Sequence, residues 1–244
     1  MRLDVVTLFP EAVDGALDFS IMARARENGA ASFNVVNPRD WTTDKHKIVD
    51  DAPYGGGAGM VLKPEPLVAC IEELVAGEAV PVVLMTPQGT PLTQAIAQRL
   101  ATHDRLVVVC GHYEGLDERV RELVVTEELS IGDYVLTGGE LPALVLIDAV
   151  VRLLPGAVGN EDSPANDSFS DGLIEHPHYT RPAEFRGLQV PEALTQGHHE
   201  QVRRWRRQQS LLRTWRRRPD LLGGAELSDE DRELLREALE QHEA

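Results

Sequence analysis

Apolar runs of strand length alternate with amphipathic segments of helical length in the N-terminal part of the chain. The runs predict strands at residues 3–9, 33–36, 80–85, 106–110 and 133–136. The segments between them predict helices at residues 11–26, 66–76, 93–101 and 117–125, with a further helix from residue 140. Strands of branched apolar residues that alternate with helices are typical of a parallel sheet covered on both faces, so the predicted fold class is α/β.

Residues 130–156 combine a short predicted strand, a glycine turn and an apolar helix. The turn is Gly138-Gly139, and the first turn of the helix holds an acidic residue and a proline. The helix is apolar nearly all round, which predicts burial on most of its faces. Asp148 and Arg152 interrupt it four residues apart. This spacing favours an intrahelical ion pair, with a charge that faces a functional site as the alternative.

The character of the sequence changes after residue 159. Residues 160–172 are polar, contain proline and serine and show no periodicity, which is typical of a flexible linker. Beyond them, an extended piece at residues 176–182 precedes predicted helices at residues 191–194, 198–208 and 229–242. We therefore predict an α/β domain at residues 1–159, the linker at residues 160–172, and a small, mainly helical domain at residues 173–244.

Glycine turns follow three of the predicted strands, at Gly89, Gly111 and Gly138-Gly139. The carboxyl ends of parallel strands share one edge of a sheet, and ligands of open α/β sheets bind at that edge. The three turns therefore predict a ligand site there, although each glycine can equally serve the backbone alone.

The connection at residues 38–60 is too long and too polar for a simple loop, which indicates a functional or mobile segment. It contains Gly55-x-Gly57, but Met60 stands where a dinucleotide fingerprint needs a third glycine. No Gly-Lys-Ser/Thr sequence occurs anywhere in the chain. These patterns argue against a nicotinamide-dependent enzyme and against a P-loop enzyme.

Charge is distributed very unevenly along the chain. The formal net charge of −16 over 244 residues argues against a nucleic-acid partner. Residues 203–218, however, contain eight arginines with Trp205 and Trp215 among them and no acid, whereas residues 226–243 are strongly acidic. Arginines neutralise phosphates and indole rings stack on bases, so the arginine segment predicts contact with nucleic acid, with a solvated helix face as the alternative.

The remaining residue types exclude several other classes of site. Cys70 and Cys110 lie in apolar surroundings without CxxC spacing, and His176 and His178 lack a nearby third ligand, so we predict no disulfide framework and no metal centre. His112 could do acid/base work, with a structural loop histidine as the alternative. No leader precedes the first strand and no apolar run has the length of a membrane span, so we expect a soluble cytoplasmic protein.

These residues together closely resemble the TrmD family of bacterial tRNA (guanine-N1)-methyltransferases, in the SPOUT superfamily. The likeness extends over essentially the whole chain. It rests on a series of motifs in the same order: Leu8-Phe9-Pro10, Pro53-Tyr54-Gly55-Gly56-Gly57, Pro87-Gln88-Gly89, Cys110-Gly111, Tyr113-Glu114-Gly115, Ser130-Ile131-Gly132-Asp133-Tyr134, Gly138-Gly139-Glu140-Leu141-Pro142, Asp167-Ser168-Phe169, Pro177-His178-Tyr179-Thr180-Arg181-Pro182 and Arg203-Arg204-Trp205.

The resemblance implies an enzyme that methylates N1 of guanosine 37, beside the tRNA anticodon, with S-adenosyl-L-methionine as the methyl donor. It implies a homodimer whose active site is shared between subunits, and a deep trefoil knot at the C-terminal end of the α/β domain. Periodicity does not indicate the knot, because chains in general do not thread through their own loops. A requirement for Mg²⁺ is also implied.

The same resemblance assigns residues to the site. The cofactor-binding residues would be Pro87, Gln88, Gly89, Gly111, Tyr113, Glu114, Ile131, Gly132, Tyr134, Leu136, Gly138, Gly139 and Pro142. The RNA-binding residues would be Ser168, Arg203, Arg204, Trp205, Arg207 and Arg213. His112 stands where arginine is the more familiar residue of the motif, which would make any RNA contact there pH-sensitive.

The chemistry of the reaction gives the polar residues their roles. Guanine N1 carries a proton and becomes nucleophilic only when a base removes it, and negative charge then spreads onto O6. The family pattern places the base at Asp167, the cation near O6 at Arg152, and Glu114 close to the methyl donor. From structure alone, Asp167 could instead be a helix N-cap.

Two other functions remain open from the sequence. One is a SPOUT methyltransferase that acts on rRNA or on a ribose 2′-hydroxyl, and the other is a non-catalytic RNA-binding relative. The combination of Asp167, Arg152 and Glu114 disfavours both, because neither needs a carboxylate that deprotonates guanine.

Overall fold

A computed structural model gives the fold of residues 1–159 and 167–243. Most of the predicted linker, residues 160–166, lies outside the described residues. The chain divides into two compact units, Met1–Glu161 and Asp162–Ala244, and each is described by itself.

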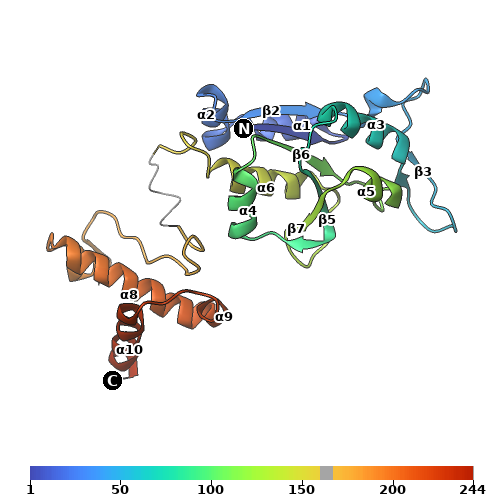
Figure 1. Ribbon diagram of the computed structural model, residues 1–244. Coiled ribbons are helices and arrows are strands. Elements are labelled where there is room, and N and C mark those ends of the chain that lie inside the picture. The colour runs from blue at the N-terminus through green and yellow to red at the C-terminus, as the bar shows by residue number, and fades with distance from the viewer. Residues whose placement is uncertain (160–166, 244) are drawn as a thin grey trace. The chain divides into compact units, whose positions relative to one another are not determined.

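The N-terminal unit contains a five-stranded sheet with the order β2-β1-β6-β5-β7 (Figure 1). All neighbouring strands pair in parallel. The strands are β1 (Arg2–Val6), β2 (Ser32–Val36), β5 (Val82–Pro91), β6 (Arg105–Cys110) and β7 (Glu127–Ser130). The predicted α/β class with a parallel sheet is confirmed.

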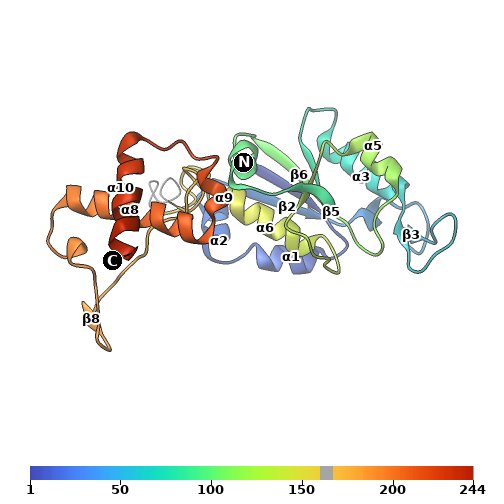
Figure 2. The same ribbon diagram turned by 90° about the horizontal axis from the view of Figure 1, so that it is seen from below.

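Successive residues of the strands enter two separate cores. Leu3 and Val5 of β1 face one core, while Val6 faces the other. The first core is covered by α1 (Pro10–Ala16), α2 (Ser20–Glu27), α4 (Gln94–Ala101) and α6 (Glu140–Val151). The second is covered by η1 (Pro38–Trp41), α3 (Pro64–Val75) and α5 (Glu118–Val124). Figure 2 shows α1, α2 and α6 together on one face of the sheet. Successive side chains of a strand point to opposite faces of the sheet, and both faces are buried. The strands are therefore nearly continuous apolar runs in the sequence.

Two predicted elements are wrong. The single helix expected at residues 11–26 is two helices, α1 and α2, because Ser20 has a positive φ of 53° that interrupts the helical path. The strand expected at residues 133–136 is irregular. Gly132 has a φ of 146°, Tyr134 and Val135 are exposed, and residues 133–136 pair with no strand of the described sheets. The last strand of the sheet is instead β7, immediately before it.

The tight turn expected at residues 87–89 lies within β5. The register of β5 against β7 shifts between Met85 and Thr90, which marks a bulge. A Cβ atom on Gly89 would lie 2.5 Å from the backbone of Glu128 and Leu129. Gly89 therefore lets the bulged strand approach its neighbour closely.

The long connection at residues 38–60 contains little regular structure. It begins with η1, and further on β3 (Asp50–Asp51) pairs antiparallel with β4 (Val61–Leu62). The loop between these short strands is rich in glycines with positive φ, and Tyr54 at its tip is fully exposed.

The C-terminal unit is built on α8 (His199–Arg217) and α10 (Asp229–Glu243), with the short helix α9 (Pro219–Leu222) between them. A 3₁₀ helix, η2 (Glu192–Leu194), and a hairpin of β8 (Glu184–Phe185) and β9 (Leu188–Gln189) precede α8. Its core is small and centres on Leu173, Leu211 and Leu234. Within residues 1–159 and 167–243, no helix combines the length and apolar character needed to cross a membrane.

Asp231 joins the two long helices of this unit. Its carboxylate accepts hydrogen bonds from Arg207 at 2.6 Å and 3.0 Å and from the backbone N–H of Ser228 at 3.0 Å. The Ser228 hydroxyl accepts in return from the backbone N–H of Asp231, which completes a capping box at the start of α10. The hydrogen bonds from Arg207 lower the pKa of Asp231 to about 2.

We expect Asp231→Asn to remove a pH-dependent part of the stability. A carboxyl whose pKa is lower in the folded state stabilises the fold above the unfolded pKa of about 3.9, and that contribution is lost as the pH falls toward 2. Urea unfolding should give a difference of about 2 kcal/mol between wild type and variant at pH 6, shrinking below pH 4. A difference that is constant from pH 6 to pH 2 would contradict this role.

Candidate functional site

A cavity of about 240 Å³ opens where β5, β6 and β7 end. Three segments line it: residues 84–88 of β5, residues 111–116 after β6, and residues 129–132 and 134–139 at the end of β7 and beyond it, together with Arg121 of α5 and Pro142 from the first turn of α6. Of the residues that the sequence assigned to cofactor binding, every one except Gly89 lines this cavity. Gly89 faces the backbone of β7 instead. Residues from all three glycine-containing segments therefore line one site, although Gly89 itself does not.

Close backbone contacts hold the three segments together. Gly139 donates its N–H to the carbonyl oxygen of Gly111 at 2.7 Å, and His112 and Gly138 form an isolated bridge. A Cβ atom on Gly139 would lie 2.7 Å from both the Cα of Cys110 and the backbone nitrogen of Gly111. The chain can cross the end of β6 at this distance only because residue 139 has no side chain.

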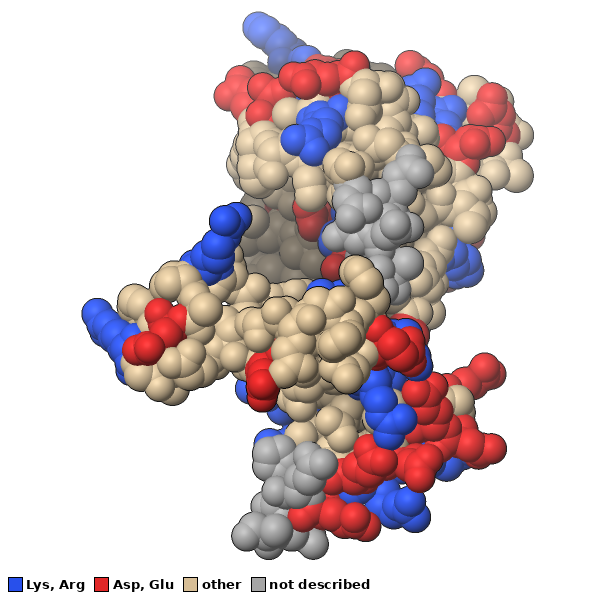
Figure 3. All heavy atoms as spheres, turned by 90° about the vertical axis from the view of Figure 1, so that its left-hand side faces the viewer, with Lys and Arg blue, Asp and Glu red and all other residues tan. Residues whose placement is uncertain are grey.

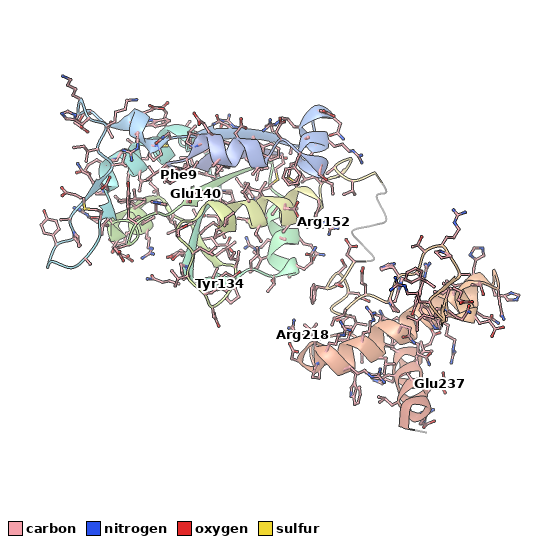
Figure 4. All side chains as sticks on the ribbon, turned by 180° about the vertical axis from the view of Figure 1, so that it is seen from behind. Phe9, Tyr134, Glu140, Arg152, Arg218 and Glu237 are labelled. Atoms are coloured by element: carbon pink, nitrogen blue, oxygen red, sulfur yellow. The ribbon has the colours of Figure 1, made fainter. Side chains whose placement is uncertain are left out.

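Glu140 is anchored beneath the cavity by a residue from the start of the chain. The Thr7 hydroxyl donates to Glu140 Oε1 at 2.8 Å, and Thr7 is 1% exposed. Figure 4 shows Glu140 beside Phe9, whose backbone N–H donates to Thr7 Oγ1 at 3.0 Å. Burial, with the nearby Glu140 carboxylate, raises the pKa of the Cys110 thiol, which therefore stays protonated and unreactive. No pattern in the sequence indicates the contact between Thr7 and Glu140, which lie 133 residues apart.

His112 lies between this carboxylate and the cavity. Its Nδ1 is 3.9 Å from Glu140 Oε2 and has no hydrogen-bond partner within the described part of the chain. Its ring packs edgewise on Phe9 and on Tyr113, with centroid distances of 4.9 Å in both cases. His112 is thus part of the packed wall of the cavity.

Glu114 is the one predicted catalytic residue that lines the cavity. Its backbone N–H donates to the carbonyl oxygen of Met60 at 3.0 Å. A Cβ atom on Gly59 would lie 2.4 Å from the Glu114 side chain, so the glycine-rich loop of residues 55–60 packs directly against it. This loop and the cavity therefore belong to one site.

The other two predicted catalytic residues lie elsewhere in the chain. Arg152 follows the last residue of α6, at the end away from Glu140 (Figure 4). The rise of an α-helix places it about 18 Å along the axis from Glu140, which begins α6 beside the cavity. Asp167 belongs to the C-terminal unit, where its carbonyl oxygen accepts from the backbone N–H of Ser170 at 3.2 Å.

Most faces of α6 are buried or half-buried, and one narrow stripe along the helix is exposed. Ala143, Leu146, Ile147, Val150 and Val151 are buried, but Leu141 is 61% and Val145 is 47% exposed. Asp148 is exposed as well. Residues 141, 145, 148 and 152 recur at helical spacing, so the exposed leucine and valine share a stripe with Arg152.

Several of the predicted RNA-binding residues are engaged within the C-terminal unit. Arg203 pairs with Glu200 at 2.7 Å and with Glu230 at 2.9 Å, and Arg204 pairs with Glu237 at 3.0 Å. Arg207 pairs with Asp231 and also with Asp171. Around α10, Figure 3 shows acidic and basic side chains interleaved.

The other predicted RNA-binding residues have different surroundings. The Trp205 ring lies 6.3 Å from that of Tyr179, and Arg213 is half-buried. The Ser168 hydroxyl accepts from the backbone N–H of Glu175 at 3.1 Å. This hydrogen bond gives Ser168 a structural role in the segment of residues 168–175.

Over residues 1–159 and 167–243, no three side chains of histidine, cysteine, aspartate or glutamate gather as a metal site would require.

Comparisons with known proteins agree with one another. The family model described as "tRNA (Guanine-1)-methyltransferase TrmD" matches residues 1–224. The chain is 58% identical over 240 residues to the tRNA (guanine-N(1)-)-methyltransferase of Moorella thermoacetica, covering 97% of this chain and 96% of the relative. It is 56% identical over 245 residues to the protein of the same name from Halalkalibacterium halodurans, covering 100% of both chains.

Proposed function

The chain belongs to the TrmD family of tRNA (guanine-N1)-methyltransferases, and we propose that it methylates guanosine 37 beside the anticodon with S-adenosyl-L-methionine as donor. Family membership over nearly the whole length establishes an enzyme that methylates guanine N1 in tRNA and needs a methyl donor. The observation that carries the proposal is the cavity at the ends of β5, β6 and β7, lined by all but one of the cofactor residues that the family pattern assigns.

The residues of the cavity fit the proposed donor. Gly138 and Gly139 let their turn pack closely against Cys110, Gly111 and His112 at the edge of the cavity, because a Cβ atom on either would collide with these neighbours. Pro87, Ile131 and Pro142 give apolar surface for an adenine ring, and exposed backbone groups of the three turns offer hydrogen bonds to its polar edge. S-adenosyl-L-methionine would supply an electrophilic methyl group there.

The proposed reaction needs one proton transfer and one developing charge to be stabilised. The Asp167 carboxylate would accept the N1 proton of guanine as N1 takes the methyl group, and Arg152 would stabilise the negative charge that spreads onto O6. Glu114, at the cavity wall, would orient the guanine edge near the donor. Because the described residues do not gather a metal site, no step is assigned to Mg²⁺.

We propose a homodimer in which Arg152 and Asp167 act in the cavity of the other subunit. Arg152 is separated from the cavity of its own chain by the length of α6, which supports this arrangement. The exposed apolar stripe formed by Leu141 and Val145 gives α6 a surface that a second copy would cover. In this proposal, the same face of α6 both holds the dimer together and carries Arg152.

We further propose that the segment through Gly138 and Gly139 is part of a trefoil knot, since it crosses the end of β6 at backbone contact distance. The domain arrangement is proposed as in the family, with residues 1–159 binding the donor, residues 160–172 as a linker and residues 173–244 holding the tRNA.

Transfer of labelled methyl groups to tRNA transcripts tests the proposed function. We expect label on a transcript with guanosine at position 37 and none when that base is adenosine, with 1-methylguanosine as the nucleoside product. Label that is independent of the base at position 37, or on a ribose hydroxyl, would overturn the substrate assignment.

A further inference from the structure

The arginines of α8 fall into two sets with different partners. Arg203, Arg204 and Arg207 form ion pairs with carboxylates, as does Arg218 just after the helix, which pairs with Asp220 at 2.7 Å. Within the described part of the chain, the other four form no ion pair, and these are Arg206, Arg213, Arg216 and Arg217.

Helical geometry separates these sets in space. At 3.6 residues per turn, each set spans an arc of about 100°, and the two arcs lie on different sides of the helix. The paired set faces α10 and Asp171, whose carboxylates compensate its charge. The second set is therefore the side of α8 with net positive charge.

A cavity of about 440 Å³ lies at the N-terminal end of the unpaired side. Arg206 and Val202 of α8 form one wall, and the segment of residues 176–183 forms another, with Arg181, His176, His178 and Tyr179 among its side chains. No aspartate or glutamate occurs among the described residues that line it. The Glu175 carboxylate, which precedes this segment in the chain, pairs with His178 at 3.0 Å.

The chemistry of this lining suits one nucleotide. Arg181 and Arg206 offer planar guanidinium groups for a phosphate, and the rings of Tyr179 and His178 offer surfaces on which a base can stack. Burial lowers the pKa of His176, which favours its neutral ring. Nδ1 lies 3.2 Å from the carbonyl oxygen of Pro177, to which the neutral ring donates, so Nε2 is left to accept a hydrogen bond from a base. The volume is within the roughly 300–1,000 Å³ typical of small-ligand pockets.

We propose that this cavity binds a single nucleotide of the tRNA, with its phosphate on Arg181 and Arg206, and that Arg213, Arg216 and Arg217 extend the phosphate track along α8. The proposal rests on the proposed function, because it takes tRNA as the ligand. The main RNA contacts of this unit would then be made by the arginines without ion pairs. Arg203, Arg204 and Arg207 could contact RNA only after their carboxylate partners had been released.

The full-length protein and a tRNA transcript test the charge requirement. Arg206→Ala should weaken tRNA binding about tenfold and reduce the slope of log affinity against log salt by about 0.7. Arg218→Ala removes the same charge from an ion-paired position and is the matched control, with affinity and slope expected to stay at wild-type values. Equal effects of the two substitutions, or no effect of Arg206→Ala, would overturn the proposal.

A second variant tests the cavity itself. Ala183→Phe places a ring in the cavity without changing any charge, and we expect it to weaken tRNA binding about tenfold while S-adenosyl-L-methionine affinity and the unfolding midpoint stay unchanged. Wild-type tRNA affinity in this variant would reject the cavity as a nucleotide site. If instead the wild-type protein binds no tRNA or methylates a different base, the proposed function fails. That result comes from the wild-type protein, so it is distinguished from the results for Arg206→Ala and Ala183→Phe.

Discussion

Asp167→Asn should lower the rate of methyl transfer by about 10²–10⁴-fold, the range that positioned general bases contribute, while leaving donor affinity unchanged. The amide keeps the size of the side chain but cannot accept the N1 proton of guanine. Asp167 is proposed to contact guanine N1 and not the donor, so donor binding should not depend on it. Single-turnover methyl transfer and calorimetric titration with S-adenosyl-L-methionine measure the two quantities separately.

Asp220→Asn is a suitable control, because Asp220 is an exposed carboxylate of the same unit whose ion pair with Arg218 contributes little. It should methylate at the wild-type rate. Turnover by Asp167→Asn equal to that of this control would reject Asp167 as the base.

The proposed sharing of sites between subunits makes a distinct prediction for mixtures of variants. A chain with Asp167→Asn retains a working cavity, and a chain with a closed cavity retains Asp167. In a mixed dimer, the intact cavity of the first chain would meet Asp167 of the second, so one of the two sites should recover activity. Dimers of either variant alone should have little activity. Absence of any recovery in dimers shown to be mixed would place the base and the cavity in the same chain.

The sequence predicted the sheet well where both faces of a strand are buried. Leu106 and Val107 enter different cores, so successive residues of β6 are all apolar. A continuous run of branched apolar residues of this length predicts a buried strand. β7 was missed because Glu127 and Glu128 make it look like a polar connection. Their charges are compensated by Arg99 at 2.5 Å and Arg121 at 3.2 Å, residues that only the folded chain brings near.

Contacts between distant parts of the chain also decide which arginines of residues 203–218 are available to nucleic acid and which are not. The sequence shows a basic stretch at residues 203–218 and an acidic one at residues 226–243, but it does not show which arginine meets which carboxylate. The pairs of Arg203 with Glu230 and of Arg204 with Glu237 join positions 27 and 33 residues apart. The fold compensates the charge on one side of the helix, and the other side carries the charge that is proposed to meet RNA.

Gly139→Ala should reduce methyl transfer about a hundredfold and lower the free energy of unfolding by about 3 kcal/mol. The added Cβ atom would meet the Cα of Cys110 and the backbone nitrogen of Gly111 at 2.7 Å, and backbone atoms cannot move aside as a flexible side chain can. The crossing must widen, which breaks the 2.7 Å hydrogen bond from Gly139 to Gly111 and shifts the first turn of α6 away from the cavity. A displacement of about 1 Å at a site that positions two reactants is enough for this loss of rate.

Gly15→Ala is the matched control, because Gly15 lies inside α1 and a Cβ atom there meets nothing within 4 Å. That substitution should keep full activity and raise the free energy of unfolding by about 0.5–1 kcal/mol, since alanine loses less backbone entropy in a helix than glycine does. Methyl-transfer assays and urea unfolding of both variants give the comparison. If Gly139→Ala retains the wild-type rate and stability, the close crossing at β6 is not what shapes the cavity.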